Sequence, residues 1–102
     1  MSDKIVVRID PDIQDLVPGF LKNRAADLDL IAGHVADGNL DGVKIIGHSM
    51  KGAGGGYGFD AITDIGARLE SAADDGDLAA IEDAANELRD YLGRVEVVPD
   101  DS

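Results

Sequence analysis

The sequence predicts an all-α protein, an antiparallel four-helix bundle, and three observations support this. Apolar residues recur at intervals of three and four in four successive segments of the 102-residue chain, which is the spacing of helices with one buried face. Short stretches rich in Gly, Asn and Asp separate these segments, as expected for tight connections between antiparallel helices. With no Trp, two Phe and two Tyr, the core must consist mainly of Leu, Ile, Val and Ala, which suits packed helices.

The first helix is expected after a short opening helix. Asp10 before Pro11 is a typical cap followed by a residue suited to a first helical turn. Pro18 then either starts a new helix or kinks the old one. The following apolar residues fall at helical intervals if Arg24 fills one gap: Leu16, Phe20, Leu28, Ile31 and Val35. The stretch ADGNLDG, residues 36–42, ends this pattern with two glycines and an asparagine.

Three further helices are predicted in the rest of the chain. The second carries Leu40, Val43, Ile46 and Met50 at helical intervals. The third carries Ile62, Ile65, Leu69 and Ala73, and it ends at the turn DDGD, residues 74–77, whose last Asp can cap the next helix. The fourth has the most regular spacing, that of a coiled-coil-like seam: Leu78, Ile81, Ala85, Leu88, Leu92 and Val95.

The two ends of the chain are rich in β-branched residues. KIVVRI at 4–9 and VEVV at 95–98 could pair as a small ribbon. The length fits one domain over residues 1–102, with an N-terminal arm at 1–9 and an acidic tail at 99–102. The Met at position 1 and the acidic PDDS sequence at residues 99–102 lead us to expect a free-standing protein.

Composition excludes several classes of function. The absence of Cys removes disulfides, thiolate zinc sites and cysteine nucleophiles, and it fits a cytoplasmic protein. With 9 basic and 21 acidic side chains the net charge is -12, which opposes binding to nucleic acid or anionic lipid and favours a monomer. The chain has no apolar run long enough for a signal peptide core or a membrane span. We therefore expect a protein or small-molecule partner.

One histidine of the second predicted helix is expected to face solvent. If Val43 marks the centre of the buried face, Ile46, Gly47 and Met50 lie within about 60° of it and His48 lies at about 140°. Lys51 and Gly52 follow three and four residues later, so they share this face, and Gly52 leaves the backbone beside the imidazole open. The buried side of the same helix carries Ile46, Gly47 and Met50.

The surroundings of His48 differ in charge from the rest of the chain. Residues 42–59 contain no Asp or Glu, although a uniform spread of the 21 acids would place about four there. Acidic groups are therefore expected to be kept away from this face, as the approach of an anionic phosphoryl group or an acidic site would require. Lys44 and the exposed apolar Ile45 are candidate docking contacts for a partner.

These residues resemble the signature of histidine phosphotransfer (HPt) domains of two-component phosphorelays. That pattern is a His, then Lys-Gly three and four residues later, then Gly at the tenth, and His48, Lys51, Gly52 and Gly58 match it. The resemblance covers most of the chain, because the family is a four-helix bundle with its active His in the middle of the second helix. The stretch Arg68, Leu69 and Glu70 also resembles the usual third helix. A departure is the triple glycine at residues 54–56, which is expected to shorten the second helix.

The resemblance implies a phosphocarrier and not an enzyme. His48 would accept a phosphoryl group from a phospho-aspartyl receiver domain or a histidine kinase and pass it to the receiver aspartate of a response regulator, since a neutral imidazole is nucleophilic. Lys51 would lie beside the phosphoryl oxygens, Gly52 would clear the approach, and Gly58 would allow a turn or close packing. No cofactor or metal is expected in this chain, because the Mg²⁺ and the acidic pocket belong to the partner receiver domain.

Sequence motifs that would indicate a different function are incomplete or absent. Residues 37–42 match the first half of an EF-hand loop, but His48 stands where the bidentate Glu is needed, so calcium binding is not expected. The chain has no phosphate-binding GxxxxGK[ST] loop, and Ser49 cannot face its neighbour His48 on a helix as a catalytic triad requires. His34 is expected to be structural. The main alternative function is a small acidic helical adaptor that binds a signalling partner without being phosphorylated.

Overall fold

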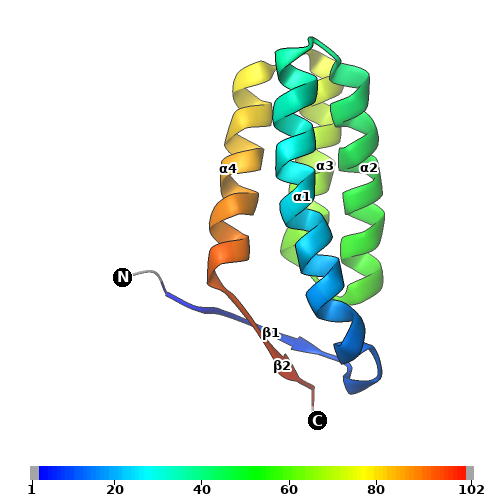
Figure 1. Ribbon diagram of the computed structural model, residues 1–102, viewed down its shortest axis with the longest axis vertical. Coiled ribbons are helices and arrows are strands. Elements are labelled where there is room, and N and C mark those ends of the chain that lie inside the picture. The colour runs from blue at the N-terminus through cyan, green and yellow to red at the C-terminus, as the bar shows by residue number, and fades with distance from the viewer. Residues whose placement is uncertain (1–2, 101–102) are drawn as a thin grey trace.

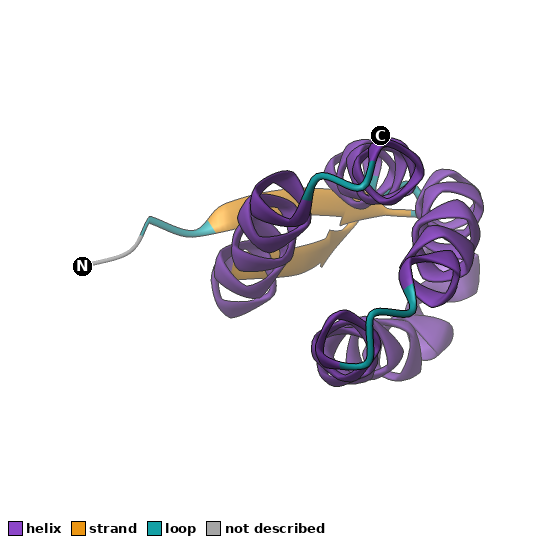
Figure 2. Cartoon of the chain, turned by 90° about the horizontal axis from the view of Figure 1, so that it is seen from above, coloured by secondary structure: helices purple, strands orange, loops and turns teal. Residues whose placement is uncertain are grey.

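Four long helices and two short strands make up the computed structural model, which describes residues 3–100. The order along the chain is β1 (Ile5–Ile9), a 3₁₀ helix (Pro11–Leu16), α1 (Val17–Ala36), α2 (Leu40–Tyr57), α3 (Asp60–Asp75), α4 (Leu78–Arg94) and β2 (Val95–Pro99). The helices run alternately up and down along one long axis (Figure 1). Seen from above, they surround this axis in chain order (Figure 2). The predicted antiparallel four-helix bundle is confirmed.

The helix ends follow the local signals in the sequence. The side chains of Asn39 and Asp77 accept hydrogen bonds from backbone N–H groups in the first turns of α2 and α4, at 3.1 and 3.0 Å. Gly58 and Gly76 end α2 and α3 in the left-handed conformation, with φ of 85° and 68°. Pro18 lies in the first turn of α1, so it starts a helix and does not kink one.

The core is aliphatic along most of the bundle and aromatic at the end nearest the two strands, the lower end in Figure 1. Phe20 of α1 stacks between Tyr57 and Phe59, with ring centroids 4.4 and 5.2 Å apart. The guanidinium of Arg24 lies 4.9 Å from the centre of the Phe20 ring. The largest fully buried side chains are Phe59, Ile9, Met50, Ile62, Ile65, Leu69, Ile81, Leu88 and Val43. This aromatic cluster ties α1 to the turn between α2 and α3.

The prediction that the triple glycine shortens the second helix is wrong. α2 continues through Gly54, Gly55 and Gly56 to Tyr57. Gly54 lies against α3, and the hydroxyl of Thr63 donates a hydrogen bond to the carbonyl of Lys51 at 3.1 Å. Packing against α3 therefore outweighs the low helix propensity of glycine in this turn.

Two of the residues assigned to helical core stripes lie on the surface instead. Leu16 and Leu78 are 54% and 53% exposed, because the first belongs to the 3₁₀ helix and the second begins α4. Val95 is the first residue of β2 and not part of the fourth helix. The residues of α4 that are buried are Ile81, Ala84, Leu88 and Tyr91.

The predicted pairing of the chain ends is confirmed, and the two strands are parallel. The register runs from Ile5 opposite Val95 to Ile9 opposite Pro99. The strands lie beneath the bundle in Figure 1, where the chain enters its first helices and leaves α4. The predicted acidic tail begins inside β2 at Pro99, and the amide of Asp100 donates to the carbonyl of Ile9 at 3.0 Å. Residues 1–2 of the predicted arm and 101–102 of the tail lie outside the described residues.

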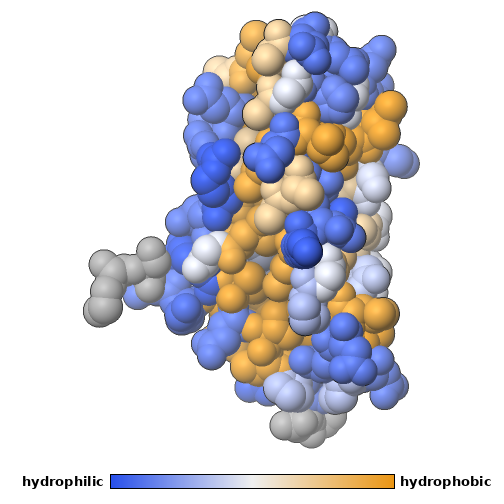
Figure 3. All heavy atoms as spheres, in the orientation of Figure 1, coloured by the Kyte–Doolittle hydropathy of each residue, from blue (hydrophilic) through white to orange (hydrophobic). Residues whose placement is uncertain are grey.

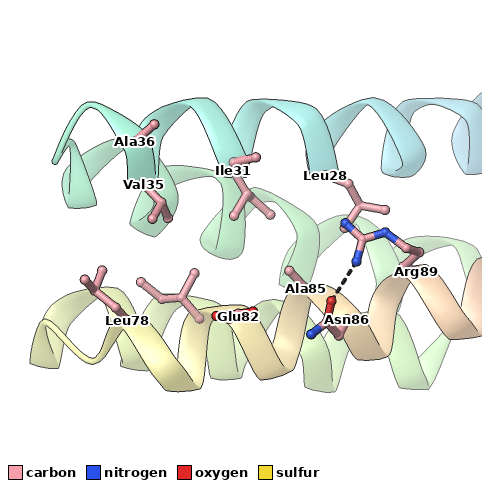
Figure 4. A pocket seen from close by; sticks show the side chains of 11 residues that line it. Leu28, Ile31, Val35, Ala36, Leu78, Glu82, Ala85, Asn86 and Arg89 are labelled. Carbon is pink, nitrogen blue, oxygen red and sulfur yellow. Dashed lines mark hydrogen bonds between the residues drawn. The ribbon is translucent and has the colours of Figure 1, made fainter.

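An apolar groove of about 590 Å³ lies between α1 and α4. Figure 3 shows the apolar band on this face of the molecule. In Figure 4, Leu28 and Val35 of α1 face Leu78 and Ala85 of α4 across the groove. Within the described part of the chain, no helix has the length and apolar character needed to cross a membrane.

Candidate functional site

His48 projects into solvent from the middle of α2. Its side chain is 71% exposed, as the helical spacing predicts, whereas Gly47 and Met50 on the opposite side of the helix are buried. Ile45, one turn earlier, is 69% exposed, and the Lys51 side chain, one turn later, is 40% exposed. We refer to this exposed side of α2, with Lys44, Ile45, His48, Lys51 and Gly52, as the His48 face.

A carboxylate from α3 reaches the His48 face. Oε2 of Glu70 lies 2.8 Å from Nδ1 of His48, and Oε1 of the same residue accepts a hydrogen bond from Nζ of Lys51 at 2.9 Å. The hydrogen bonds from Lys51 and, second, from His48 lower the pKa of Glu70 below its ordinary value. An ionised carboxylate can only accept hydrogen bonds, so Nδ1 of His48 must carry the proton. Nε2 is then the nitrogen of the neutral ring that keeps a free lone pair.

The expectation that acids are kept away from this face is therefore wrong. Residues 42–59 indeed lack Asp and Glu, but the neighbouring helix supplies Glu70 and Asp74. Asp74 accepts a hydrogen bond from Nζ of Lys44 at 3.0 Å, and this bond raises the pKa of Lys44. Glu70 is the site residue that motif matching did not assign to the site. Its contact with His48 joins residues that are 22 apart in the sequence and on different helices, so local spacing does not reveal it.

The two glycines of the motif occupy different places. A methyl group added at Gly52 would meet no atom within 4 Å, so the surface beside His48 is open there. Gly58 follows ten residues after His48, about 15 Å along the helix axis, and forms the turn into α3. The structure therefore joins Gly52 to the His48 face and places Gly58 in the framework that ends α2.

We predict a moderate loss of stability for Gly58→Ala. At φ of 85° an added Cβ crowds the following carbonyl oxygen, which costs about 1–2 kcal/mol. The matched control is Gly33→Ala in α1, where a methyl group meets nothing within 4 Å and should stabilise the protein by about 0.5–1 kcal/mol. Urea unfolding of both variants measures the difference, and equal effects would show that the turn imposes no strain.

The stability supplied by Glu70 should depend on pH. Because its pKa is lower in the folded chain than in the unfolded chain, the carboxylate stabilises the fold above its ordinary pKa of about 4.3, and this contribution is lost as the pH falls through the lowered value. The difference in unfolding free energy between the natural chain and Glu70→Gln should therefore be largest near neutrality and shrink in acid. A difference that stayed constant through this titration would show that Lys51 and His48 do not hold the carboxylate.

The region of the calcium-loop match is used to begin a helix. Leu40 is the first residue of α2, and the side chain of Asn39 caps it by accepting from the amide of Gly42. The ring of His34 packs against Gly42, and its Nδ1 lies 3.3 Å from the side-chain nitrogen of Asn39. Among residues 3–100, no three or more His, Cys, Asp or Glu side chains are grouped so that they could hold a metal ion.

Comparison with protein families gives one assignment. A family model described as Hpt domain matches residues 15–97, which include all four helices and the whole His48 face. Comparisons with curated proteins and with solved structures gave no significant match. The matched part is most of the chain, and its four-helix architecture is that of the family. The chain therefore belongs to the Hpt domain family, whose function is phosphotransfer in His–Asp phosphorelays.

Proposed function

We propose that this chain is a phosphorelay intermediate that carries a phosphoryl group on Nε2 of His48. The observation that supports this most strongly is the contact of one carboxylate, Glu70, with both His48 and Lys51. This contact selects the tautomer in which Nε2 is the nucleophile, and it sets a cation one helical turn from the reacting ring. Hpt domains are phosphocarriers and not true enzymes, and the same description is proposed here.

The proposed transfer begins with a receiver domain that carries a phospho-aspartate. The lone pair of Nε2 attacks the phosphorus, the new N–P bond forms, and the bond between phosphorus and the aspartate oxygen breaks, so that a free carboxylate leaves. The ring becomes positively charged, and Glu70 stabilises it through the hydrogen bond from Nδ1. Lys51 can turn its ammonium group from Glu70 to the phosphoryl oxygens, because its side chain is 40% exposed. Transfer onward to another receiver aspartate is the reverse of this step.

The partners in this proposal are receiver domains of response regulators and a hybrid histidine kinase. Their docking surface is the His48 face, where Ile45 offers an exposed apolar contact and Lys44 a cation beside Asp74. The Mg²⁺ and the remaining catalytic groups are supplied by the receiver domain. The proposal includes a cytoplasmic monomer, which the lack of Cys and the net charge of -12 support.

The test is phosphotransfer from a panel of receiver domains that have been phosphorylated beforehand. We expect at least one receiver to lose its label while the chain gains a phosphate that is labile in acid and stable in base, as a phosphoramidate is. If no receiver labels the chain, while circular dichroism confirms that it is helical, the proposal is overturned. Binding of a receiver without transfer would then favour the acidic adaptor.

A further inference from the structure

α2 and α3 approach each other most closely at two glycines. A methyl group added at Gly66 would lie 2.5 Å from the backbone nitrogen of Lys51 and 2.7 Å from the carbonyl oxygen of Gly47. A methyl group added at Gly47 would lie 2.6 Å from the backbone nitrogen of Glu70 and 2.8 Å from the carbonyl oxygen of Gly66. All four neighbours are backbone atoms, so a side chain at either glycine would force the helices apart.

This contact lies directly beneath the groups that meet on the His48 face. Gly47 precedes His48 in α2, and Gly66 lies four residues before Glu70 in α3. The backbone atoms nearest to these two positions belong to Lys51, to Glu70 and to the opposite glycine. The separation of the helices at this level therefore sets the distances from the Glu70 carboxylate to Nδ1 of His48 and to Nζ of Lys51.

We infer that Gly47 and Gly66 are positioning residues for phosphotransfer, and this inference rests on the proposed function. They let α2 and α3 approach closely enough for one carboxylate to hold the His48 proton on Nδ1 and to hold Lys51 at the same time. A hydrogen bond weakens steeply as its distance and angle depart from the ideal, so a small separation of the helices breaks this double contact. Their role is carried out through Glu70, and neither glycine touches the phosphoryl group.

A third glycine provides a matched control for this inference. Gly54 is also pressed against α3, and a methyl group there would lie 2.6 Å from the backbone nitrogen of Thr63. It follows His48 by six residues, about 9 Å along the helix axis. Gly54→Ala should therefore disturb the same helix pair and lower stability, but leave the contacts of Glu70 with His48 and Lys51 in place. A merely structural role would make Gly66→Ala and Gly54→Ala indistinguishable.

The experiment combines a spectroscopic readout with phosphotransfer. Nuclear magnetic resonance of ¹⁵N-labelled protein distinguishes the tautomers of His48 by the chemical shifts of its ring nitrogens, with His34 as an internal reference. We expect protonated Nδ1 in the natural chain and in Gly54→Ala, and a shift towards protonated Nε2 in Gly66→Ala. Phosphotransfer to Gly66→Ala should be slower by on the order of tenfold to a hundredfold, as for other small misplacements of reacting groups.

A second variant covers the case in which Gly66→Ala fails to fold. Glu70→Asp leaves both glycines and the packing unchanged but shortens the acid by one methylene, so it should produce the same tautomer shift and the same slower transfer. The inference is overturned if folded Gly66→Ala keeps the natural tautomer and rate, if Gly54→Ala shifts the tautomer equally, or if Glu70→Asp does neither. The tautomer is measured without a phosphoryl donor. If receivers transferred no phosphoryl group to the natural chain but its tautomers were as expected, the result would therefore count against the proposed function alone.

Discussion

Replacing His48 with Gln should abolish acid-labile labelling of the chain by phosphorylated receivers. The amide of Gln keeps a polar group of similar reach on the helix surface, but it has no nucleophilic nitrogen that can form a phosphoramidate. Because the natural side chain is 71% exposed, the fold and its stability should change little. The measurement is the amount of label on the chain after incubation with a receiver that labels the natural protein.

The matched control for this prediction is His34→Gln. His34 is the other histidine of the chain, and it packs against the start of α2 at Gly42 instead of lying on the His48 face. Its replacement should leave labelling intact. Binding of an unphosphorylated receiver to His48→Gln should also persist, since the rest of the docking surface is unchanged. Label that remained on His48→Gln would assign the phosphoacceptor to another residue.

Phe59→Ala should cause the largest loss of stability among single substitutions of the core. Its side chain is fully buried at the turn between α2 and α3, and its ring stacks on Phe20 of α1. Removing such a ring leaves a cavity and lowers the free energy of unfolding by about 3–5 kcal/mol. For a domain whose total stability is about 5–15 kcal/mol, this is a large fraction. Urea or thermal unfolding of the purified variant measures the loss.

Leu30→Ala serves as the control for the core substitution. Leu30 lies in α1 and is 53% exposed, so its truncation should change the free energy of unfolding by less than about 0.5 kcal/mol. Phe59→Leu, which keeps an apolar side chain, should fall between the two variants. A loss below about 1 kcal/mol for Phe59→Ala would contradict the packing at the lower end of the bundle.

The starts of α2 and α4 and the end of α3 could be predicted from the sequence because their signals are local. Asn39 and Asp77 accept hydrogen bonds from amides only three residues later, and Gly76 supplies the left-handed conformation that ends α3. The outward direction of His48 was also predictable, since it follows from the rotation of a single helix. Pairing of the two β-rich ends was predicted. Their parallel direction depends on where the whole bundle places the end of α4 relative to β1.

The rest of the site depends on contacts between residues far apart in the sequence. Glu70 lies 22 residues after His48, and its contact requires both the rotation of α3 and its close approach to α2. The lack of Asp and Glu near His48 in the sequence therefore did not predict the carboxylates that α3 brings to the His48 face. The triple glycine misled for the same reason: its low helix propensity is a local property, whereas the packing of Gly54 against Thr63 is not.

The central claim is that Nε2 of His48 carries the phosphoryl group while Glu70 holds the proton on Nδ1. The most direct measurement is nuclear magnetic resonance of the phosphorylated chain with ¹⁵N-labelled histidine, in which coupling between ³¹P and ¹⁵N identifies the bonded nitrogen. We predict coupling to Nε2 of His48 and a proton on its Nδ1. Phosphorus bonded to Nδ1, to His34, or to a residue that is not a histidine would contradict this account.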